Sequence, residues 1–421
     1  MNTSPRDASI ACWMAGASSV SPSPLAPNAV TSTHESGLLS AAICLQSPID
    51  IYWHTHRGPC RPPARLLRNQ TEIDLHARRW LTMAPTQNQD PSTPRIPLLV
   101  IGGPTACGKT EAALRVAEAL EGEIVSADSM QIYRSMDIGT AKPTPEERAR
   151  APIHLIDFVD PRDGYTVADF QRDARAAICG IHSRGRLPIL CGGTGLYLRA
   201  VLGHLAFPPD PSQLEGIRRS LSREAERLGQ AEMYRRLVEI DPDAAGRIEP
   251  NDTRRVLRAL EVIEMTGRPF SAQQQIDATP GVDYNSACFV LTRPRERLYE
   301  GIERRVDDML EAGWRQEVEA LARLGCTRVS QAMQAIGYRH LMAHLAGETA
   351  YPETVRLIKR DTRRFAKRQL TWLRAERWGL PPGSGAPNSA LWLEWSTTRE
   401  FDEAVAAISQ AAATWMSGRP H

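Results

Sequence analysis

Residues 102–110 read GGPTACGKT, and they include the residue types that a phosphate site requires. Gly103, Gly108, Lys109 and Thr110 satisfy the pattern G-x-x-x-x-G-K-[ST]. The glycines let backbone N–H groups surround an anion, Lys109 can reach a terminal phosphate, and the Thr110 hydroxyl can ligate Mg²⁺. This chemistry needs two linked phosphates but no nucleoside. The loop therefore predicts a diphosphate site and leaves open which molecule carries the diphosphate. The residues predicted to surround it are Gly103, Pro104, Thr105, Ala106, Cys107, Gly108, Lys109 and Thr110.

Two further polar residues follow buried, strand-like runs. Asp128 ends the run in SADSMQIY, and Thr194 follows LPIL in CGGTGLY. A phosphotransferase is expected to have an acid after a later strand, whereas LPIL runs into small residues and a hydroxyl. Because strands of a doubly wound sheet direct their carboxyl ends to one crevice, we expect both side chains above the loop. A helix N-cap for Asp128 and a strand-end cap for Thr194 are the structural alternatives.

Apolar periodicity predicts the elements that position these residues. A buried strand over 96–102 leads into the loop, and a helix opens at Lys109. Further strands are expected at 123–128, 154–159, 187–193 and 287–293, with a helix over 167–185. This alternation predicts an α/β fold, namely a parallel sheet of the phosphate-loop NTPase type with helices on both faces.

Composition divides the chain into five segments. Residues 1–94 are rich in Ser, Pro and Ala without periodicity, which indicates a disordered segment or a spurious extension with Met83 as the true start. The remaining segments are the phosphate-loop core, a charged helical insertion, a return to the core with basic helices, and a tail whose pattern favours a strand and a helix. Their ranges are 95–209, 210–285, 286–380 and 381–421.

Charge and cysteine usage limit the class of protein. The net charge is only +2, so contact with nucleic acid requires local clustering of basic residues. The eight cysteines form no C-x-x-C pair and no metal-type cluster with histidine, which indicates a reducing, cytoplasmic compartment and no structural zinc. No apolar run approaches the length of a membrane span, so we expect no membrane partner.

Six motifs, in order, resemble those of the tRNA dimethylallyltransferase family. They read GPTACGKT, DSMQIYRSMDIGTAKP, GGTGLY, NDTRRVLRALEV, AIGYR and AKRQLTWLR, and they lie within residues 96–375. The resemblance implies transfer of a dimethylallyl group from its diphosphate to N6 of the adenosine 3′ to the anticodon. It further implies Mg²⁺ as cofactor, tRNA as partner through its anticodon stem-loop, and a monomer.

The family motifs also imply roles for single residues. Asp128 matches the general base, Lys109 and Arg305 match cations that stabilise the departing diphosphate, and Thr194 matches a hydrogen-bonding residue near the reaction. Arg304 lies beside Arg305, and the sequence does not separate the two. The metal ligand is Thr110. The residues implied to contact tRNA are Asp128, Ser129, Met130, Gln131, Thr194, Arg254, Arg255, Val256, Leu257, Arg258, Gln334, Ala335, Ile336, Gly337, Tyr338 and Arg339.

Three features fit an RNA substrate or depart from the family. The segment 356–374 carries many basic residues and a single acid, which favours phosphate contacts, with a solvated helix face as the alternative. Tyr338 in GYR suits stacking on a base, with core packing as the alternative. Cys107 replaces the usual serine, and its place beside Lys109 at a helix N-terminus predicts a lowered thiol pKa and reactivity with maleimides.

Two other functions use the same residues. A small-molecule kinase would hold ATP in the loop but would leave the long insertion and the basic helix without a purpose. A non-catalytic RNA-binding module would not need both Lys109 and Asp128.

Overall fold

The computed structural model describes residues 95–202, 211–273, 284–376, 378 and 390–417. The predictions made for residues 1–94 lie outside these ranges. Within them, no helix is long and apolar enough to cross a membrane.

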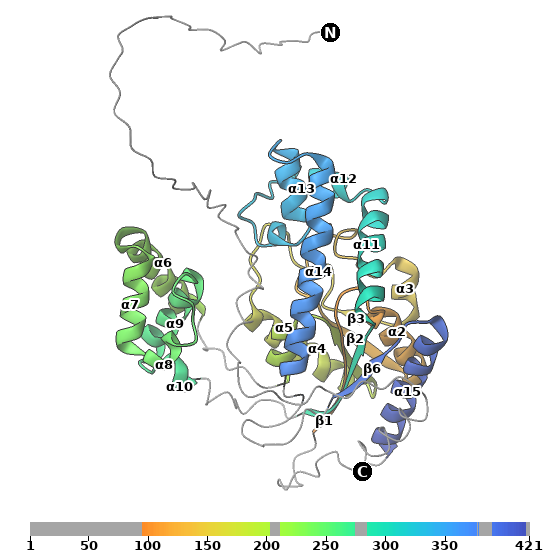
Figure 1. Cartoon of the computed structure of the whole chain (residues 1–421). Coiled ribbons are helices and arrows are strands. Elements are labelled where there is room, and N and C mark those ends of the chain that lie inside the picture. Colours follow the sequence, from red (N-terminus) through yellow and green to blue (C-terminus); the bar gives the residue numbers. More distant parts are fainter. Residues whose placement is uncertain (1–94, 203–210, 274–283, 377, 379–389, 418–421) are drawn as a thin grey trace, which may run out of the picture. The chain divides into compact units, whose positions relative to one another are not determined.

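The six strands form one fully parallel sheet (Figure 1). Its strand order is β3-β2-β4-β1-β5-β6, and each neighbouring pair is parallel. The strands are β1 (Ile96–Gly102), β2 (Gly122–Ala127), β3 (Ile153–His154), β4 (Leu187–Gly192), β5 (Tyr284–Thr292) and β6 (Leu391–Glu394). The predicted parallel α/β fold is confirmed.

Helices cover both faces of the sheet. Alternate residues of each strand point to opposite faces, so each face has its own hydrophobic core. Leu98 and Val100 of β1 pack with α4 (Val167–Ser183) and α5 (Gly195–Val201). Leu99 and Ile101 point to the other face, where α2 (Lys109–Leu120) and α15 (Thr398–Ser417) pack (Figure 1). The strands are buried on both faces, which explains their nearly continuous apolar runs.

The strand order places the phosphate loop where the chain reverses direction across the sheet. After β1 the chain crosses β4 to form β2, and after β4 it passes over β1 to form β5. Gly102 and Gly192, the last residues of β1 and β4, are direct partners in the register. The segments that follow these two strands therefore begin side by side, at the usual position of a ligand crevice.

The predicted strand over 154–159 is wrong beyond its first residue. β3 contains only Ile153 and His154, since Leu155 and Asp157 adopt positive φ angles of 59° and 63°. A left-handed residue turns the chain out of a β-ladder. The segment instead bonds to the loop after β2, where Asp157 N–H donates to the Gln131 carbonyl over 2.9 Å.

The remaining helices form two groups. In the chain after β5 lie α11 (Arg295–Glu311), α12 (Trp314–Arg323), the short η2 (Ala332–Gln334), α13 (Tyr338–Leu345) and α14 (Tyr351–Ala375); the six-residue α3 (Pro145–Arg150) precedes β3. Between β4 and β5 lie α6 (Pro211–Leu228), α7 (Gln230–Ile240), α8 (Pro242–Ala245), α9 (Thr253–Thr266) and α10 (Phe270–Gln273). The second group has its own core, which includes Leu221, Leu237 and Leu260.

Candidate active site

The phosphate loop folds as its glycines predict. Helix α2 begins at Lys109, and Gly108 before it adopts a φ of 85°. A Cβ atom at position 108 would lie 3.0 Å from the ring of Phe401 and 3.1 Å from that of Trp395, so both the backbone angle and the space require glycine. The Lys109 ammonium donates to the Pro104 carbonyl over 3.3 Å, across the loop. This arrangement keeps the cation beside the helix N-terminus, where an anion is favoured.

A tryptophan from the C-terminal segment supports the loop from behind. The Trp395 indole N–H donates to the Cys107 carbonyl over 2.9 Å. The guanidinium of Arg293 lies over the Trp395 ring, 4.3 Å from its centroid. Sequence reasoning missed Trp395, because nothing in its local sequence indicates contact with a loop far along the chain.

The prediction of a lowered pKa for Cys107 is wrong. The side chain is fully buried, and the Sγ atom lies against Gly103, where a Cβ atom would come within 2.5 Å of it. Burial raises the pKa of the Cys107 thiol, and the charge of Lys109 opposes this only in part. The thiol therefore belongs to the core beneath the loop.

Cys107 should consequently react slowly with maleimides in the folded protein. Both burial and the raised pKa reduce the exposed thiolate, which is the reactive form. Labelling followed by peptide mass spectrometry, with and without denaturant, measures this, and the partly exposed Cys179 serves as the reference thiol. Labelling of Cys107 as fast as that of Cys179 would contradict the buried position. Cys107→Ser should remain active, since the loop presents backbone groups.

Asp128 and Thr194 converge as predicted, and each also has a structural contact. Asp128 Oδ1 accepts the backbone N–H groups of Met130 at 2.9 Å and Gln131 at 3.4 Å. The Thr194 hydroxyl accepts the Ser129 N–H at 3.3 Å, so the segments after β2 and β4 are directly joined. The second carboxylate oxygen of Asp128 has no hydrogen bond to the described residues. The carboxylate thus shapes its turn through one oxygen and leaves the other for chemistry.

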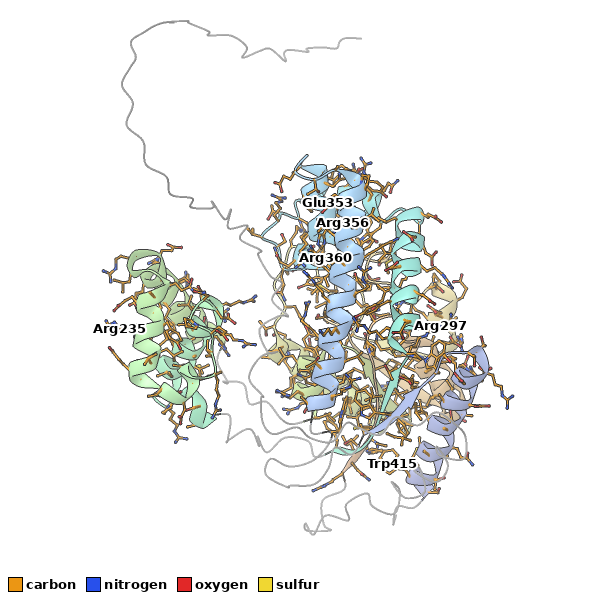
Figure 2. All side chains as sticks on the ribbon, in the orientation of Figure 1. Arg235, Arg297, Glu353, Arg356, Arg360 and Trp415 are labelled. Carbon is orange, nitrogen blue, oxygen red and sulfur yellow. The ribbon has the colours of Figure 1, made fainter. Side chains whose placement is uncertain are left out.

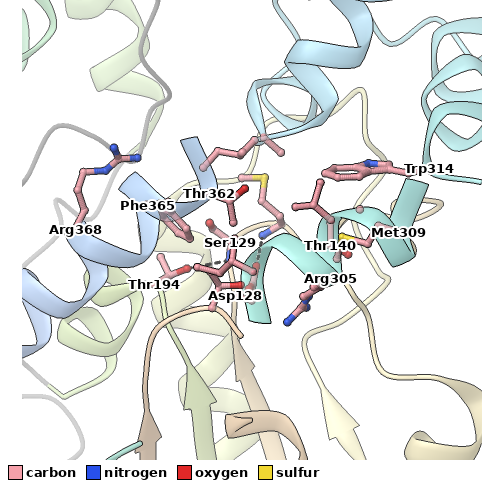
Figure 3. A pocket seen from close by; sticks show the side chains of 17 residues that line it. Asp128, Ser129, Thr140, Thr194, Arg305, Met309, Trp314, Thr362, Phe365 and Arg368 are labelled. Atoms are coloured by element: carbon pink, nitrogen blue, oxygen red, sulfur yellow. Dashed lines mark hydrogen bonds between the residues drawn. The ribbon is translucent and has the colours of Figure 1, made fainter. Parts of the chain in front are cut away.

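These residues line a cavity of about 120 Å³. Figure 3 shows side chains from the strand ends meeting side chains from α11, α12 and α14. The polar lining consists of Thr105, Asp128, Ser129, Thr140, Thr194, Arg305, Thr362 and Arg368. Apolar side chains, among them Met309, Trp314 and Phe365, complete it. These three residues were not identified from the sequence, because nothing in their local sequences distinguishes them from apolar residues of a core.

The structure separates Arg305 from its neighbour. Arg305 lines the cavity and is half-buried, whereas Arg304 is exposed and does not line it. The Arg305 guanidinium makes no hydrogen bond or ion pair with the described residues. Burial lowers the pKa of Arg305, while the nearby charge of Asp128 acts in the opposite direction. A partly desolvated cation without a protein partner is suited to an anionic ligand.

The residues implied to contact RNA around the cavity differ in accessibility. Ser129 and Gln131 are buried, and the Gln131 amide donates to the carbonyls of Thr140 and Ala141 at 3.2 Å. Met130, Ala335 and Ile336 line the cavity. Gln334 donates to the Arg328 carbonyl, and Arg339 donates to Asp361 at 3.3 Å.

The stacking role predicted for Tyr338 is wrong. Its side chain is fully buried, with the ring packed edge-on against Trp314 at 5.7 Å between centroids. Its hydroxyl donates to Glu317, whose carboxylate also accepts the N–H groups of Asp137, Ile138 and Gly139. Tyr338 therefore fixes the loop after β2 from the core and offers no face to a base.

The segment Arg254–Arg258 lies on α9, whose two faces serve different purposes. Val256 is fully buried in the core of the insertion. The prediction that it contacts RNA is therefore wrong for its side chain. Arg255 is buried as well, 3.4 Å from Asp252. Leu257 packs against the same core, and Arg258 pairs with Glu261 at 2.9 Å. Arg254 is the exposed cation of this segment.

The described residues contain no cluster of three or more His, Cys, Asp or Glu side chains that could hold a metal ion. A Mg²⁺ ion on a phosphate loop does not need one, because phosphate oxygens and water supply most of its ligands. The Thr110 hydroxyl stands on the first turn of α2 and makes no hydrogen bond within the described part. The loop is therefore compatible with a Mg²⁺ ion at the Thr110 hydroxyl, which stays a prediction.

Comparison with known proteins gives a consistent family. The families described as "IPP transferase" and "Isopentenyl transferase" match residues 131–376 and 96–157. The chain is 50% identical over 278 residues to tRNA dimethylallyltransferase 2 of Geotalea uraniireducens, a match that covers 66% of this chain and 89% of that protein. It is also 50% identical over 283 residues to the tRNA dimethylallyltransferase of Symbiobacterium thermophilum, covering 67% of this chain and 88% of that protein.

Solved structures agree with the sequence comparison. The tRNA isopentenylpyrophosphate transferase of Bacillus halodurans aligns with a TM-score of 0.54 and 39% identity, covering 77% of this chain and 99% of that one. A eukaryotic dimethylallyltransferase acting on tRNA aligns with a TM-score of 0.65 and 28% identity, covering 77% and 80%. By its motifs, its fold and these relatives, the chain belongs to the tRNA dimethylallyltransferase family.

Proposed function

We propose that this protein transfers the dimethylallyl group of dimethylallyl diphosphate to N6 of the adenosine 3′ to the anticodon of tRNA. The observation that carries the proposal is the shared cavity: the carboxylate of Asp128 and the guanidinium of Arg305, which has no partner among the described residues, line one space beside the phosphate loop. A base and an anion-stabilising cation are what an allylic transfer to an amine requires. A kinase would use the same loop, cation and carboxylate, and the match to tRNA dimethylallyltransferases supports the transferase over the kinase.

The reaction forms one C–N bond, breaks one C–O bond and transfers one proton from the amine to a base. The N6 atom of adenine attacks the allylic carbon, the bond from that carbon to the bridging oxygen breaks, and diphosphate leaves. The amine is a poor nucleophile because its lone pair is delocalised into the ring, so loss of its proton assists attack. Asp128 takes that proton through the oxygen that makes no hydrogen bond to the described residues, and Thr194 beside it orients the amine. Arg305 and Lys109 stabilise the charge that develops on the diphosphate.

Thr110 would hold a Mg²⁺ ion, which would supply further charge neutralisation for the diphosphate. The remaining interactions belong to the chain itself. The N-terminus of α2 supplies partial positive charge, and Lys109 supplies a full one close to it. The apolar side chains of Val306, Met309 and Phe365 form a hydrophobic part of the cavity lining that can bind the prenyl group.

Helix α14 provides the surface on which we propose that tRNA lies. Most of its cations are paired: Arg356 with Glu353 at 2.6 Å, both labelled in Figure 2, Lys359 with Asp307 at 2.7 Å, and Arg363 with Glu303. The Lys367 ammonium is exposed and makes no ion pair with the described residues. A solvated, unpaired cation one turn from Arg363 is free to bind a phosphate.

Lys367→Ala should therefore weaken tRNA binding. It should also reduce the magnitude of the negative slope of log K against log salt by about 1, the effect of one lost phosphate contact. Affinity for dimethylallyl diphosphate should stay unchanged. Binding titrations at several salt concentrations measure both quantities. Arg399→Ala on α15 is the matched control, since it removes the same charge from an exposed position. An equal slope for the Lys367 variant and the wild type would show that this part of α14 is a solvated face.

We further propose that the enzyme acts as a monomer in the cytoplasm. The five described cysteines that carry free thiols fit a reducing compartment, which is where tRNA is modified.

The proposal is tested with radiolabelled dimethylallyl diphosphate and an anticodon stem-loop RNA. Wild-type protein with Mg²⁺ should label the RNA at the adenosine 3′ to the anticodon, and ATP should compete for the loop without being hydrolysed. Lys109→Ala should abolish labelling and leave RNA binding nearly intact. ATP hydrolysis that depends on Lys109, without labelling of any RNA, would establish the kinase function instead. RNA binding without either reaction would leave a binding module.

A further inference from the structure

A buried glutamine of α14 joins the phosphate loop to the segment after β4. The Gln369 side-chain oxygen accepts the backbone N–H of Thr105 over 2.9 Å, and its nitrogen donates to the Gly193 carbonyl over 2.9 Å. Only 3% of Gln369 is exposed, so water does not replace either partner. One amide therefore satisfies a donor from the loop and an acceptor from the neighbouring strand end.

The fit around this amide is tight. A Cβ atom at position 193 would come within 2.4 Å of the Gln369 nitrogen and 2.8 Å of the Gly103 carbonyl oxygen. Glycine at 193 thus lets three segments meet: the loop, the end of β4 and the C-terminal part of α14. Bonds of this kind fix the separation of the segments, because a shift of either one breaks a buried hydrogen bond.

Of the two segments joined by Gln369, one is proposed to bind the prenyl donor and the other to bind the acceptor amine. Thr105 belongs to the loop that holds the diphosphate, and Thr194, directly after Gly193, lies with Asp128 on the acceptor side. Helix α14 itself adds Thr362, Phe365 and Arg368 to the cavity lining. The amide thus stands between the donor and acceptor halves without lining the cavity.

We propose that Gln369 is a positioning residue that sets the distance between the diphosphate loop and the acceptor side of the cavity. It touches neither substrate and acts through Thr105 and Gly193. This inference depends on the proposed function for the roles of these two sides. Its physical basis is that in-line transfer depends steeply on the placement of the reacting atoms, and a misplacement of about 1 Å costs about 10²-fold in rate.

The test compares Gln369→Met and Gln369→Glu with the wild type in steady-state prenyl transfer. Methionine keeps the volume and removes both hydrogen bonds, so kcat should fall by up to about 10²-fold. The KM for dimethylallyl diphosphate and the Kd for stem-loop RNA should stay as in the wild type. Gln331→Met is the matched control, because the Gln331 amide makes the same pair of bonds, with the N–H and carbonyl of Tyr165, and does not line the cavity. Its kcat should be unchanged.

Gln369→Glu gives a readout that a purely structural role does not share. The glutamate can still accept the Thr105 N–H, but its second oxygen opposes the Gly193 carbonyl until it is protonated, and burial raises its pKa. The ratio of variant to wild-type kcat should therefore rise as the pH is lowered. Thermal unfolding and binding stoichiometry of dimethylallyl diphosphate establish the folded fraction in each case.

The outcomes are distinct. A folded Gln369→Met protein with unchanged kcat would overturn the proposal, as would a fall in kcat that only follows the folded fraction. If the methionine variant does not fold, the pH dependence of the glutamate variant decides, and a flat ratio overturns the proposal. Absence of prenyl transfer in the wild type would instead refute the proposed function.

Discussion

Asp128→Asn should lower kcat for prenyl transfer by about 10²–10⁴-fold, the usual contribution of a positioned general base. The structure makes asparagine the informative change. Asp128 Oδ1 accepts the N–H groups of Met130 and Gln131, and an amide oxygen can accept both. The other oxygen becomes an NH₂ group, which cannot take a proton from N6. The variant thus retains the turn and loses only the base.

Three measurements separate chemistry from structure in this variant. The melting temperature and the affinities for RNA and dimethylallyl diphosphate should match those of the wild type, since the turn is intact. Asp128→Ala is the comparison: it loses the hydrogen bonds of the turn as well and should be less stable by about 1 kcal/mol, as for a lost helix cap. Near-normal turnover by the asparagine variant would mean that Asp128 only shapes the turn.

The loop and the sheet were predictable because their signals are local. The pattern from Gly103 to Thr110 requires a strand before it and a helix after it, and β1 and α2 supply both within a few residues. The convergence of Asp128 and Thr194 followed from the expected parallel sheet, since parallel strands bring their carboxyl ends to one edge. Both inferences rest on geometry that any parallel sheet shares.

Properties that depend on burial could not be read from the sequence. Cys107 stands beside a lysine and a helix N-terminus, which predicts a lowered pKa, but desolvation raises the pKa of the thiol. Tyr338 lies between a glycine and an arginine, a pattern typical of RNA contact, yet Trp314 and Glu317 enclose it. In both cases residues far along the chain decide the outcome, and one sequence does not reveal their packing.

Long-range supports were missed for the same reason. Trp395 bonds to a loop residue 288 positions away in the sequence, and Gln369 bonds to one 264 positions away. The motif AKRQLTWLR is notable in sequence for its basic residues, whereas in the structure its glutamine bonds to Thr105 of the loop and to Gly193 after β4. A motif therefore locates a functional region more reliably than it distinguishes the residues within it.

Arg305→Ala should lower kcat by about 10²–10³-fold, as expected when one group that stabilises a developing anion is removed. Its side chain lines the cavity with Asp128, Thr105 and Thr194 and has no partner among the described residues. Arg304→Ala is a control one residue away that removes the same charge from an exposed position. That variant should retain wild-type turnover, because its guanidinium does not line the cavity.

Stability provides an independent check on Arg305. Burial lowers the pKa of this guanidinium, which means that the free protein holds a charge that it does not fully compensate. Arg305→Ala should therefore melt at or above the temperature of the wild type while losing activity, the combination expected of a residue kept for its ligand. Thermal unfolding without and with diphosphate separates the two contributions, since diphosphate should stabilise the wild type more than the variant. Loss of stability together with unchanged turnover would show that Arg305 serves the fold, and a loss of turnover in Arg304→Ala would transfer the role to its neighbour.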